Sequence, residues 1–276
     1  MNHTVSFIGS GNMGGAIIRA ACQALDPAKI QITDYDPDKA KALAAQTGCK
    51  TAADNEEAVR SGDYIFLCVK PQVMGSVLEG ISAVLNDELA NGHPKVLVSI
   101  AAGLTLETLR SKLTGACQKL PIIRIMPNTP VAIGKGMLAL SAKDDVNEEM
   151  IADVKEILSK AGRLEQLPEN MIDAFTSVSG CAPAFVCLFI EALADGGVLC
   201  GLTRTQALTY AAQTVMGSAS MVLETGEHPG ALKDAVCSPK GSTIVGVAAL
   251  ERHGFRSAAI EAVIDSYNKN TDLGKH

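Results

Sequence analysis

The stretch Val5-Ser6-Phe7-Ile8-Gly9-Ser10-Gly11-Asn12-Met13-Gly14 decides the fold of this chain. Its first four residues read as a strand, and apolar residues after the glycines recur at helical spacing as far as Leu25. Gly9, Gly11 and Gly14 form a Gly-x-Gly-x-x-Gly motif where strand meets helix. There the first glycine allows a tight turn, the second lets a pyrophosphate approach the backbone, and the third lets helix and strand pack closely. The motif therefore predicts a dinucleotide-binding βαβ unit.

Further expected strands alternate with helical patterns, as in a parallel sheet covered by helices. The expected strands are Val5–Ile8, Ile30–Thr33, 63–69, 95–100, Ile122–Met126 and 137–140. Two of them, 63–69 and 95–100, are too continuously apolar to have a face in water. A helix over residues 146–158 follows, which Asp145 is placed to cap. We expect an α/β fold in which residues 1–167 form an N-terminal Rossmann dinucleotide-binding domain.

From Pro168 onward, strand-like runs give way to long alanine-rich helical patterns. The expected helices cover residues 184–200, 204–224, 231–236, 243–252 and 256–268. The first of them is apolar nearly all round, which predicts burial inside the domain or against a second subunit. We therefore expect residues 168–276 to form an all-helical domain.

Length and charge agree with two packed units and argue against a nucleic-acid partner. The 276 residues exceed the usual span of roughly 100–200 residues for one domain. Thirty acidic residues against 24 basic ones give a net charge of −6, so the chain lacks the basic surface that nucleic acid requires.

Cysteine usage and apolar runs favour a cytoplasmic protein. The eight cysteines form no Cys-x-x-Cys pair and mostly lie in apolar runs, which indicates buried thiols and predicts no metal site. No basic stretch precedes the first apolar run, and the longest apolar stretch, residues 182–193, is shorter than the roughly 20 residues that cross a bilayer. We expect no membrane contact.

Asp34 ends the second strand, where a dinucleotide fold places an acid that accepts hydrogen bonds from the adenosine ribose. An acid there repels the 2′-phosphate of NADP(H), and Asp36 adds negative charge before the first base, Lys39. Electrostatics therefore favour NAD(H). The alternative is that Asp34 or Asp36 only caps the helix that begins near Pro37.

Two other strand ends lie at the edge where open α/β sheets bind ligands. They are Cys68-Val69-Lys70-Pro71 and Ile100-Ala101-Ala102-Gly103. The small residues of the second would leave room for a nicotinamide ring, although both could be ordinary βα loops.

Several motifs make the chain resemble the pyrroline-5-carboxylate reductases. They are Phe7-Ile8-Gly9-Ser10-Gly11-Asn12-Met13-Gly14, Val69-Lys70-Pro71, Met126-Pro127-Asn128-Thr129-Pro130, Ala192-Leu193-Ala194-Asp195-Gly196-Gly197 and, most specifically, the stretch from Ser238-Pro239-Lys240-Gly241-Ser242-Thr243 to Glu251. The resemblance implies reduction of 1-pyrroline-5-carboxylate to L-proline by hydride transfer from NAD(P)H, the last step of proline synthesis. It also implies a helical domain that dimerises by interleaving, so that each active site borrows the 238–243 loop of its partner. In some members the dimers assemble into decamers.

The resemblance also implies roles for individual residues. Thr243 would hydrogen-bond the ring nitrogen, Ser238, Gly241 and Ser242 would surround the substrate carboxylate, and Glu169 would be an acid near the substrate. The implied cofactor residues are Ile8, Gly9, Ser10, Gly11, Asn12, Met13, Asn55, Val69, Lys70, Pro71, Ala101, Ala102 and Gly103. Members commonly carry Asn-Arg-Ser where this chain has Asp34-Tyr35-Asp36, so NADPH use is in question.

The residues themselves leave alternatives to these roles. The helix that starts near Gly241 has free N–H groups that could hold a carboxylate, but Thr243 could equally be a simple helix cap. Another reductase of Rossmann-plus-helical build, such as a β-hydroxyacid dehydrogenase, would need Lys233 or Lys240 as its acid. A non-catalytic protein that senses dinucleotides is the third alternative.

Overall fold

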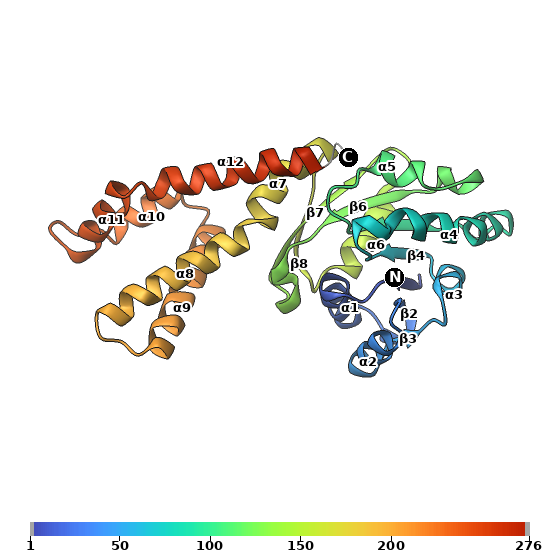
Figure 1. Cartoon of the computed structure of the whole chain (residues 1–276), viewed down its shortest axis with the longest axis horizontal. Coiled ribbons are helices and arrows are strands. Elements are labelled where there is room, and N and C mark those ends of the chain that lie inside the picture. The colour runs from blue at the N-terminus through green and yellow to red at the C-terminus, as the bar shows by residue number, and fades with distance from the viewer. Residues whose placement is uncertain (1–2, 274–276) are drawn as a thin grey trace. The chain divides into compact units, whose positions relative to one another are not determined.

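The computed structural model describes residues 3–273, which form two compact units (Figure 1). The first unit runs to Gly180 and takes in the chain again from Tyr267, and the second is Cys181–Ser266. The predicted boundary after residue 167 lies where strands give way to helices, before the division between the units.

The first unit contains one sheet with the order β3-β2-β1-β4-β5-β6-β7-β8. Its strands are β1 (Val5–Ile8), β2 (Ile30–Thr33), β3 (Lys50–Thr51), β4 (Tyr64–Leu67), β5 (Val96–Ser99), β6 (Ile122–Met126), β7 (Gly136–Ala142) and β8 (Gly162–Gln166). All neighbours pair in parallel except β6 and β7. The chain turns from one side of β1 to the other between β3 and β4, which places a topological switch point beside the glycine motif.

Helices cover both faces of this sheet. They are α1 (Asn12–Ala24), α2 (Pro37–Thr47), α3 (Asn55–Ser61), α4 (Pro71–Ala90), α5 (Leu106–Ser111), α6 (Glu148–Ile157) and α7 (Ile172–Phe175), with short turns η1 (Pro27–Lys29), η2 (Gly115–Lys119), η3 (Thr129–Ile133), η4 (Glu169–Met171) and η5 (Thr176–Gly180). Alternate strand residues face opposite sides: Tyr64 and Phe66 pack in the cluster with α1, α2 and α6, whereas Ile65 and Leu67 pack with α3, α4 and α5. The continuous apolar strands thus have no wet face.

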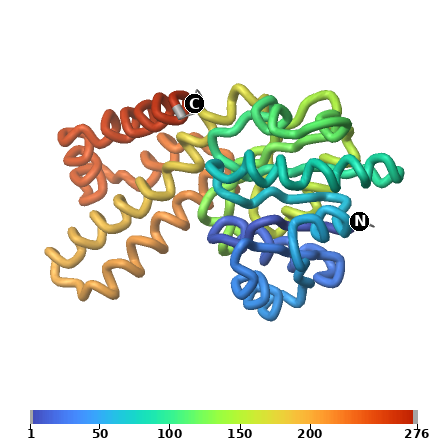
Figure 2. Tube along the Cα trace, turned by 45° about the vertical axis from the view of Figure 1, so that its right-hand side comes forward, coloured from blue at the N-terminus to red at the C-terminus, as the bar shows by residue number. Residues whose placement is uncertain are grey.

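The second unit is helical throughout. Its helices are α8 (Ala182–Leu199), α9 (Arg204–Thr225), α10 (Pro229–Ala235), α11 (Ser242–Arg252) and the larger part of α12 (Phe255–Leu273). The trace in Figure 2 shows α8 and α9 side by side, and alanines 194, 207 and 211 form the buried centre of their contact. The expected change to an all-helical region is confirmed.

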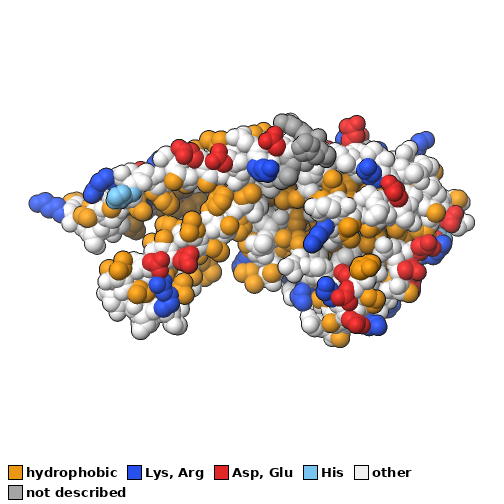
Figure 3. Space-filling model, viewed as in Figure 1, with side chains coloured by type: hydrophobic (Ala, Val, Ile, Leu, Met, Phe, Trp, Pro, Cys, Tyr) orange, Lys and Arg blue, Asp and Glu red, His pale blue; other side chains and the backbone are white. Residues whose placement is uncertain are grey.

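Helix α8 is not covered on every side within the chain. Its single buried residue is Ala194, and Leu188 keeps 67% of its surface exposed. Figure 3 shows hydrophobic side chains along this helix. Of the two kinds of burial expected for it, burial inside the domain is therefore wrong, which leaves burial against a second subunit.

Three expectations from the sequence need correction. Asp145 does not cap α6: the cap is Asn147, whose side chain accepts from Met150 N at 2.9 Å, while Asp145 pairs with Arg110. The thiols of Cys187 and Cys200 are exposed in the single chain. The apolar stretch near α8 belongs to a helical run of 31 residues, Glu169–Leu199, which is long and apolar enough to cross a membrane by length and composition alone.

Candidate functional site

The glycine motif forms an open cradle at the carboxyl end of β1. Gly9 has φ +101°, and a Cβ there would lie 2.7 Å from the carbonyl oxygen of Cys68. A Cβ on Gly14 would lie 2.6 Å from the oxygen of Gly9, whereas one on Gly11 would meet nothing within 4 Å. The first and third glycines are therefore needed by the protein itself, and the second leaves space outside it.

The start of α1 borders this space. Gly11 is its N-cap, no side chain caps the helix, and its first turn holds no acid. The first backbone N–H groups thus lack side-chain partners and can receive an anion, which fits the pyrophosphate of a dinucleotide.

Asp34 lies at the end of β2 and is fixed against this loop. Its Oδ2 accepts hydrogen bonds from Ser10 N at 2.6 Å and Ser10 Oγ at 2.7 Å, and its Oδ1 accepts from Asp36 N at 3.0 Å. Burial alone would raise the pKa of this carboxyl, but these hydrogen bonds outweigh it and hold the pKa below its usual value. The cap of α2 is Asp36, which accepts from Asp38 N. The capping alternative thus holds for Asp36 and fails for Asp34.

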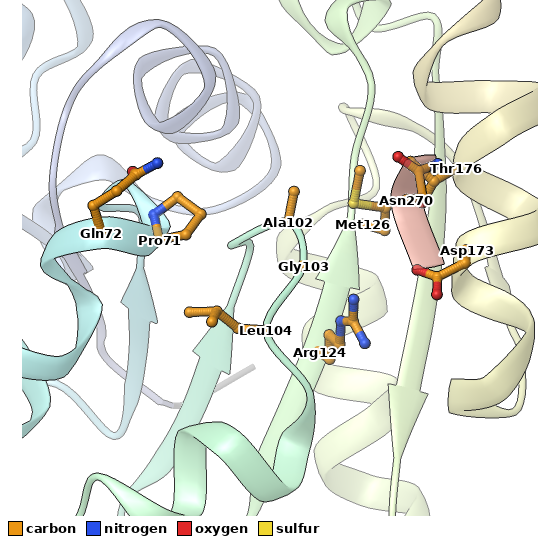
Figure 4. Close-up of a pocket in the computed structure, with 10 residues that line it drawn as sticks. All are labelled: Pro71, Gln72, Ala102, Gly103, Leu104, Arg124, Met126, Asp173, Thr176 and Asn270. Carbon is orange, nitrogen blue, oxygen red and sulfur yellow. The ribbon is translucent and has the colours of Figure 1, made fainter. Parts of the chain in front are cut away.

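The ends of β4 and β5 meet at one cavity of about 460 Å³ (Figure 4). Pro71 contributes from the start of α4, and Ala102 and Gly103 contribute from the loop after β5. The rest of its lining includes Arg124 and Met126 of β6, Asp173 of α7, Thr176 and Asn270. Val69 is half-buried and Lys70 exposed, and Ala101 is buried behind the loop.

Sequence reasoning missed Arg124, Asp173 and Asn270 in this cavity. One signal was available: Arg124 stands in the otherwise apolar strand Ile122–Met126, and a charged residue there must be buried with a partner. Asp173 and Asn270 carry no comparable signal, because only the fold brings α7 and the end of α12 to the same wall.

Two predicted residues lie apart from the open cavity wall. Asn55 lines a separate hollow with Ser76 and Gly80 of α4. Glu169 is held by protein groups: its Oε1 accepts from Leu106 N at 2.7 Å and from Arg124 Nη1 at 3.1 Å. It thereby ties the start of α5 to β6.

The 238–243 loop belongs to the second unit. Lys240 has φ +58°, an uncommon left-handed value for a side chain other than glycine, and Gly241 N donates to Ser238 O at 3.0 Å. Gly241 leads into α11 without a side-chain cap, and Thr243 is exposed. Thr243 as a helix cap is therefore wrong.

Comparison with known proteins agrees with this layout. Residues 4–103 match the family described as NADP oxidoreductase coenzyme F420-dependent, and residues 169–273 match pyrroline-5-carboxylate reductase dimerisation. The pyrroline-5-carboxylate reductase of Escherichia coli is 46% identical, with all of both chains aligned. The chain belongs to the pyrroline-5-carboxylate reductase family.

Solved structures of pyrroline-5-carboxylate reductases share the whole fold. The Coxiella burnetii protein superposes with a TM-score of 0.90 at 29% identity over all of both chains. The Plasmodium falciparum protein, solved with NADP bound, gives 0.83 at 31% identity over 99% of this chain and 98% of that one. The dimerisation match supports a homo-oligomer, and the matched residues include α8 with its exposed apolar side chains.

Membership of this family removes the support for the other two functions considered from the sequence. The β-hydroxyacid dehydrogenase reading required Lys233 or Lys240 as its acid, and relatives named pyrroline-5-carboxylate reductase over the whole chain favour the imine reductase instead. The relatives that support this family are named as reductases, which favours an enzyme over a protein that only senses dinucleotides.

Proposed function

We propose that this enzyme reduces 1-pyrroline-5-carboxylate to L-proline and uses NADH in preference to NADPH. Family membership supports the reaction, and the fixed carboxylate of Asp34 is the observation that carries the cofactor preference. A bound nicotinamide nucleotide supplies the hydride. The protein's own residues must hold both reactants and stabilise the charge on nitrogen.

Asp34 favours the unphosphorylated ribose for two reasons. Its lowered pKa keeps it negatively charged at neutral pH, and its hydrogen bonds to Ser10 prevent it from turning away. The nearest bases are already engaged: Lys39 lies 3.6 Å from Asp36, and Lys41 lies 3.7 Å from Asp38. A 2′-phosphate would therefore meet unbalanced negative charge.

The same arrangement supports the predicted cofactor residues around it. Ile8 to Gly14 provide the cradle for the pyrophosphate, and Val69 to Pro71 and Ala101 to Gly103 follow the strands on the nicotinamide side of β1. Asn55 stays a prediction from the family resemblance.

For the substrate we propose the loop before α11. Ser238, Gly241 and Ser242 would hold the carboxylate at the uncapped helix start, and Thr243 would hydrogen-bond the ring nitrogen. Orientation of the ring accounts for more of the rate than a single proton donor. Glu169 would act near the substrate only through Arg124 and Leu106.

We further propose a homodimer with interleaved helical domains that lends the 238–243 loop between protomers, with decamers as a further assembly. The exposed apolar residues of α8 and the dimerisation match support the dimer. The cytoplasm is the compartment that suits a biosynthetic reductase with unpaired cysteines.

Initial rates with 1-pyrroline-5-carboxylate test both parts of the proposal. We expect a higher kcat/KM with NADH than with NADPH. Asp34→Ser removes the carboxylate that repels the 2′-phosphate, so it should lower the NADH/NADPH ratio of kcat/KM about tenfold, which corresponds to about 1.4 kcal/mol. The matched control is Asp144→Ser, which removes the same charge from an exposed turn before α6, away from Asp34. No turnover of the imine would refute the reaction, and an equal ratio in wild type and Asp34→Ser would refute the role of Asp34.

A further inference from the structure

The cavity beside Gly103 has a cation and an anion on its walls that do not pair with each other. Arg124 and Asp173 both line it, as Figure 4 shows, yet no ion pair within 4.0 Å joins them. Within residues 3–273, the Asp173 carboxylate accepts no hydrogen bond and joins no ion pair. An unpartnered carboxylate facing a buried guanidinium across open space indicates a ligand with both acceptor and donor groups.

Within the described part of the chain, the guanidinium of Arg124 uses only one of its nitrogens in a hydrogen bond. Its side chain is 5% exposed, its Nη1 donates to Glu169 Oε1 at 3.1 Å, and its Nε is buried without a partner. Among the described residues nothing accepts from its Nη2. The bond to Glu169 fixes the guanidinium plane and so leaves the remaining amino group for the cavity.

Net charge around the cavity selects a neutral ligand group. One arginine stands against two carboxylates: Asp173 on the cavity wall, and Glu169, which bonds Arg124 from an adjoining hollow. A ligand carboxylate would therefore meet net negative charge, whereas a neutral group that accepts from Arg124 and donates to Asp173 satisfies both. A primary carboxamide has this pair of groups on one carbon.

The position of the cavity identifies which carboxamide. Asp34 takes the adenosine half on the β2 side of the glycine loop, so an extended dinucleotide continues over β4, β5 and β6. Pro71, Gly103 and Met126 follow or end these three strands and line the cavity. Leu104 adds an apolar wall for a ring.

We propose that Arg124 and Asp173 hold the carboxamide of the nicotinamide ring, with Arg124 donating to its oxygen and Asp173 accepting from its N–H. The proposal rests on the proposed function in taking a nicotinamide nucleotide as the cofactor and in placing its adenosine half at Asp34. Asp173 would be a specificity-determining residue, since it reads the amide nitrogen that distinguishes nicotinamide from 3-acetylpyridine. Glu169 would be a positioning residue for Arg124.

Equilibrium binding tests this independently of turnover. Calorimetric titrations of the full chain would compare NAD⁺, its 3-acetylpyridine analogue and ADP-ribose, which lacks the ring. We expect wild type to bind NAD⁺ about tenfold more tightly than the acetylpyridine analogue, as one lost hydrogen bond to a charged group implies. Asp173→Ala should abolish that preference and leave the affinity for ADP-ribose unchanged.

Asp144→Ala is the matched control, because it removes the same charge from an exposed turn before α6. Asp173→Asn should keep part of the preference, since its amide oxygen still accepts a hydrogen bond. A preference that survives in Asp173→Ala would overturn the proposal, as would an equal loss of ADP-ribose affinity. If Asp173→Ala raised the KM for the imine but kept the preference for NAD⁺ over the acetylpyridine analogue, the cavity would belong to the substrate, and the proposal would again be overturned. If the nucleotides bound to wild type and Asp173→Ala as expected but wild type did not reduce the imine, only the proposed function would be refuted, and the role of Asp173 would stand.

Discussion

Helices α4 and α8 are both long and apolar, but the chain buries them very differently. In α4, seven of 20 residues are buried against the sheet, including Met74, Leu78 and Ile81. In α8, one of 18 residues is buried, and it is an alanine. The first unit thus closes its own core, while the second leaves much of its apolar surface exposed within the chain.

The difference separates two sources of stability within one protein. The Rossmann unit gains its free energy of folding from apolar area that it covers itself. The helical unit has a centre of three alanines and cannot gain much that way, so we expect its stability to depend on assembly and on protomer concentration.

The largest effect is expected from a charge placed on the uncovered face of α8. Leu188→Glu puts a carboxylate into what we take to be an apolar interface, and an unpaired buried charge disfavours association by several kcal/mol. We expect the homo-oligomer to dissociate at micromolar concentration and kcat/KM to fall at least about a hundredfold (2.7 kcal/mol). Light scattering coupled to gel filtration measures the mass.

The control lies on the Rossmann unit. Ile133 is 76% exposed there, so Ile133→Glu introduces the same charge on a surface with no proposed partner. It should leave both mass and activity near wild type. An unchanged mass for Leu188→Glu would show that α8 is not the association surface.

Thr243 sharpens the comparison by asking whether the helical unit supplies chemistry as well as assembly. Its side chain is exposed and caps nothing, so Thr243→Ala should leave mass and Tm unchanged. We expect kcat/KM with the imine to fall roughly tenfold to a hundredfold, the size of one lost polar contact in the transition state. Thr243→Ser keeps the hydroxyl and should recover most of the rate. If Thr243→Ala turned over as fast as wild type, the residue would have no part in the reaction.

The same contrast explains how far the sequence alone predicts the fold. Buried strands such as Tyr64–Leu67 are unbroken apolar runs and are predicted correctly. Strand β8 was missed because Gly162–Gln166 lies at the sheet edge with three exposed residues and reads as polar. The cap of α6 was misplaced because Asp145 and Asn147 are both residue types that can cap a helix. Asp145 pairs with Arg110 instead, and Asn147 caps the helix.

The site divides along similar lines. The glycine cradle and Asp34 follow from a local motif, since a strand, a turn and a helix start are encoded within a few residues. Arg124, Asp173 and Asn270 meet only after three distant segments fold together, and no spacing in the sequence records that meeting. Burial of α8 failed as a prediction within the chain because composition shows that a face is apolar but not which chain covers it.

Two glycines of the cradle separate stability from binding within the Rossmann unit. Gly14→Ala forces a Cβ to within 2.6 Å of the Gly9 oxygen and should lower the free energy of unfolding by about 1–3 kcal/mol. Gly11→Ala meets nothing in the protein, so its Tm should stay near that of wild type while its affinity for NAD⁺ falls. Thermal unfolding and a NAD⁺ titration of both variants check this. Equal destabilisation by the two changes would mean that the open space at Gly11 serves folding rather than the cofactor.

The smallest expected effect concerns acid stability, and it again differs between the units. The pKa of Asp34 is lowered in the fold despite its partial burial, so its contribution is present above the ordinary pKa of about 4 and is lost as pH falls through the lowered value. Asp34→Asn should therefore reduce the loss of stability between pH 5 and pH 3 by no more than about 1 kcal/mol, since solvent screens this half-exposed group. In the helical unit the Glu251 pKa is also lowered, by its hydrogen bond from Arg256, but that pair is exposed, and Glu251→Gln should leave the acid limb unchanged. Unfolding by urea at pH 3, 4, 5 and 7 without cofactor measures both variants, and a larger effect of Glu251→Gln would reverse the assignment of acid sensitivity to the Rossmann unit.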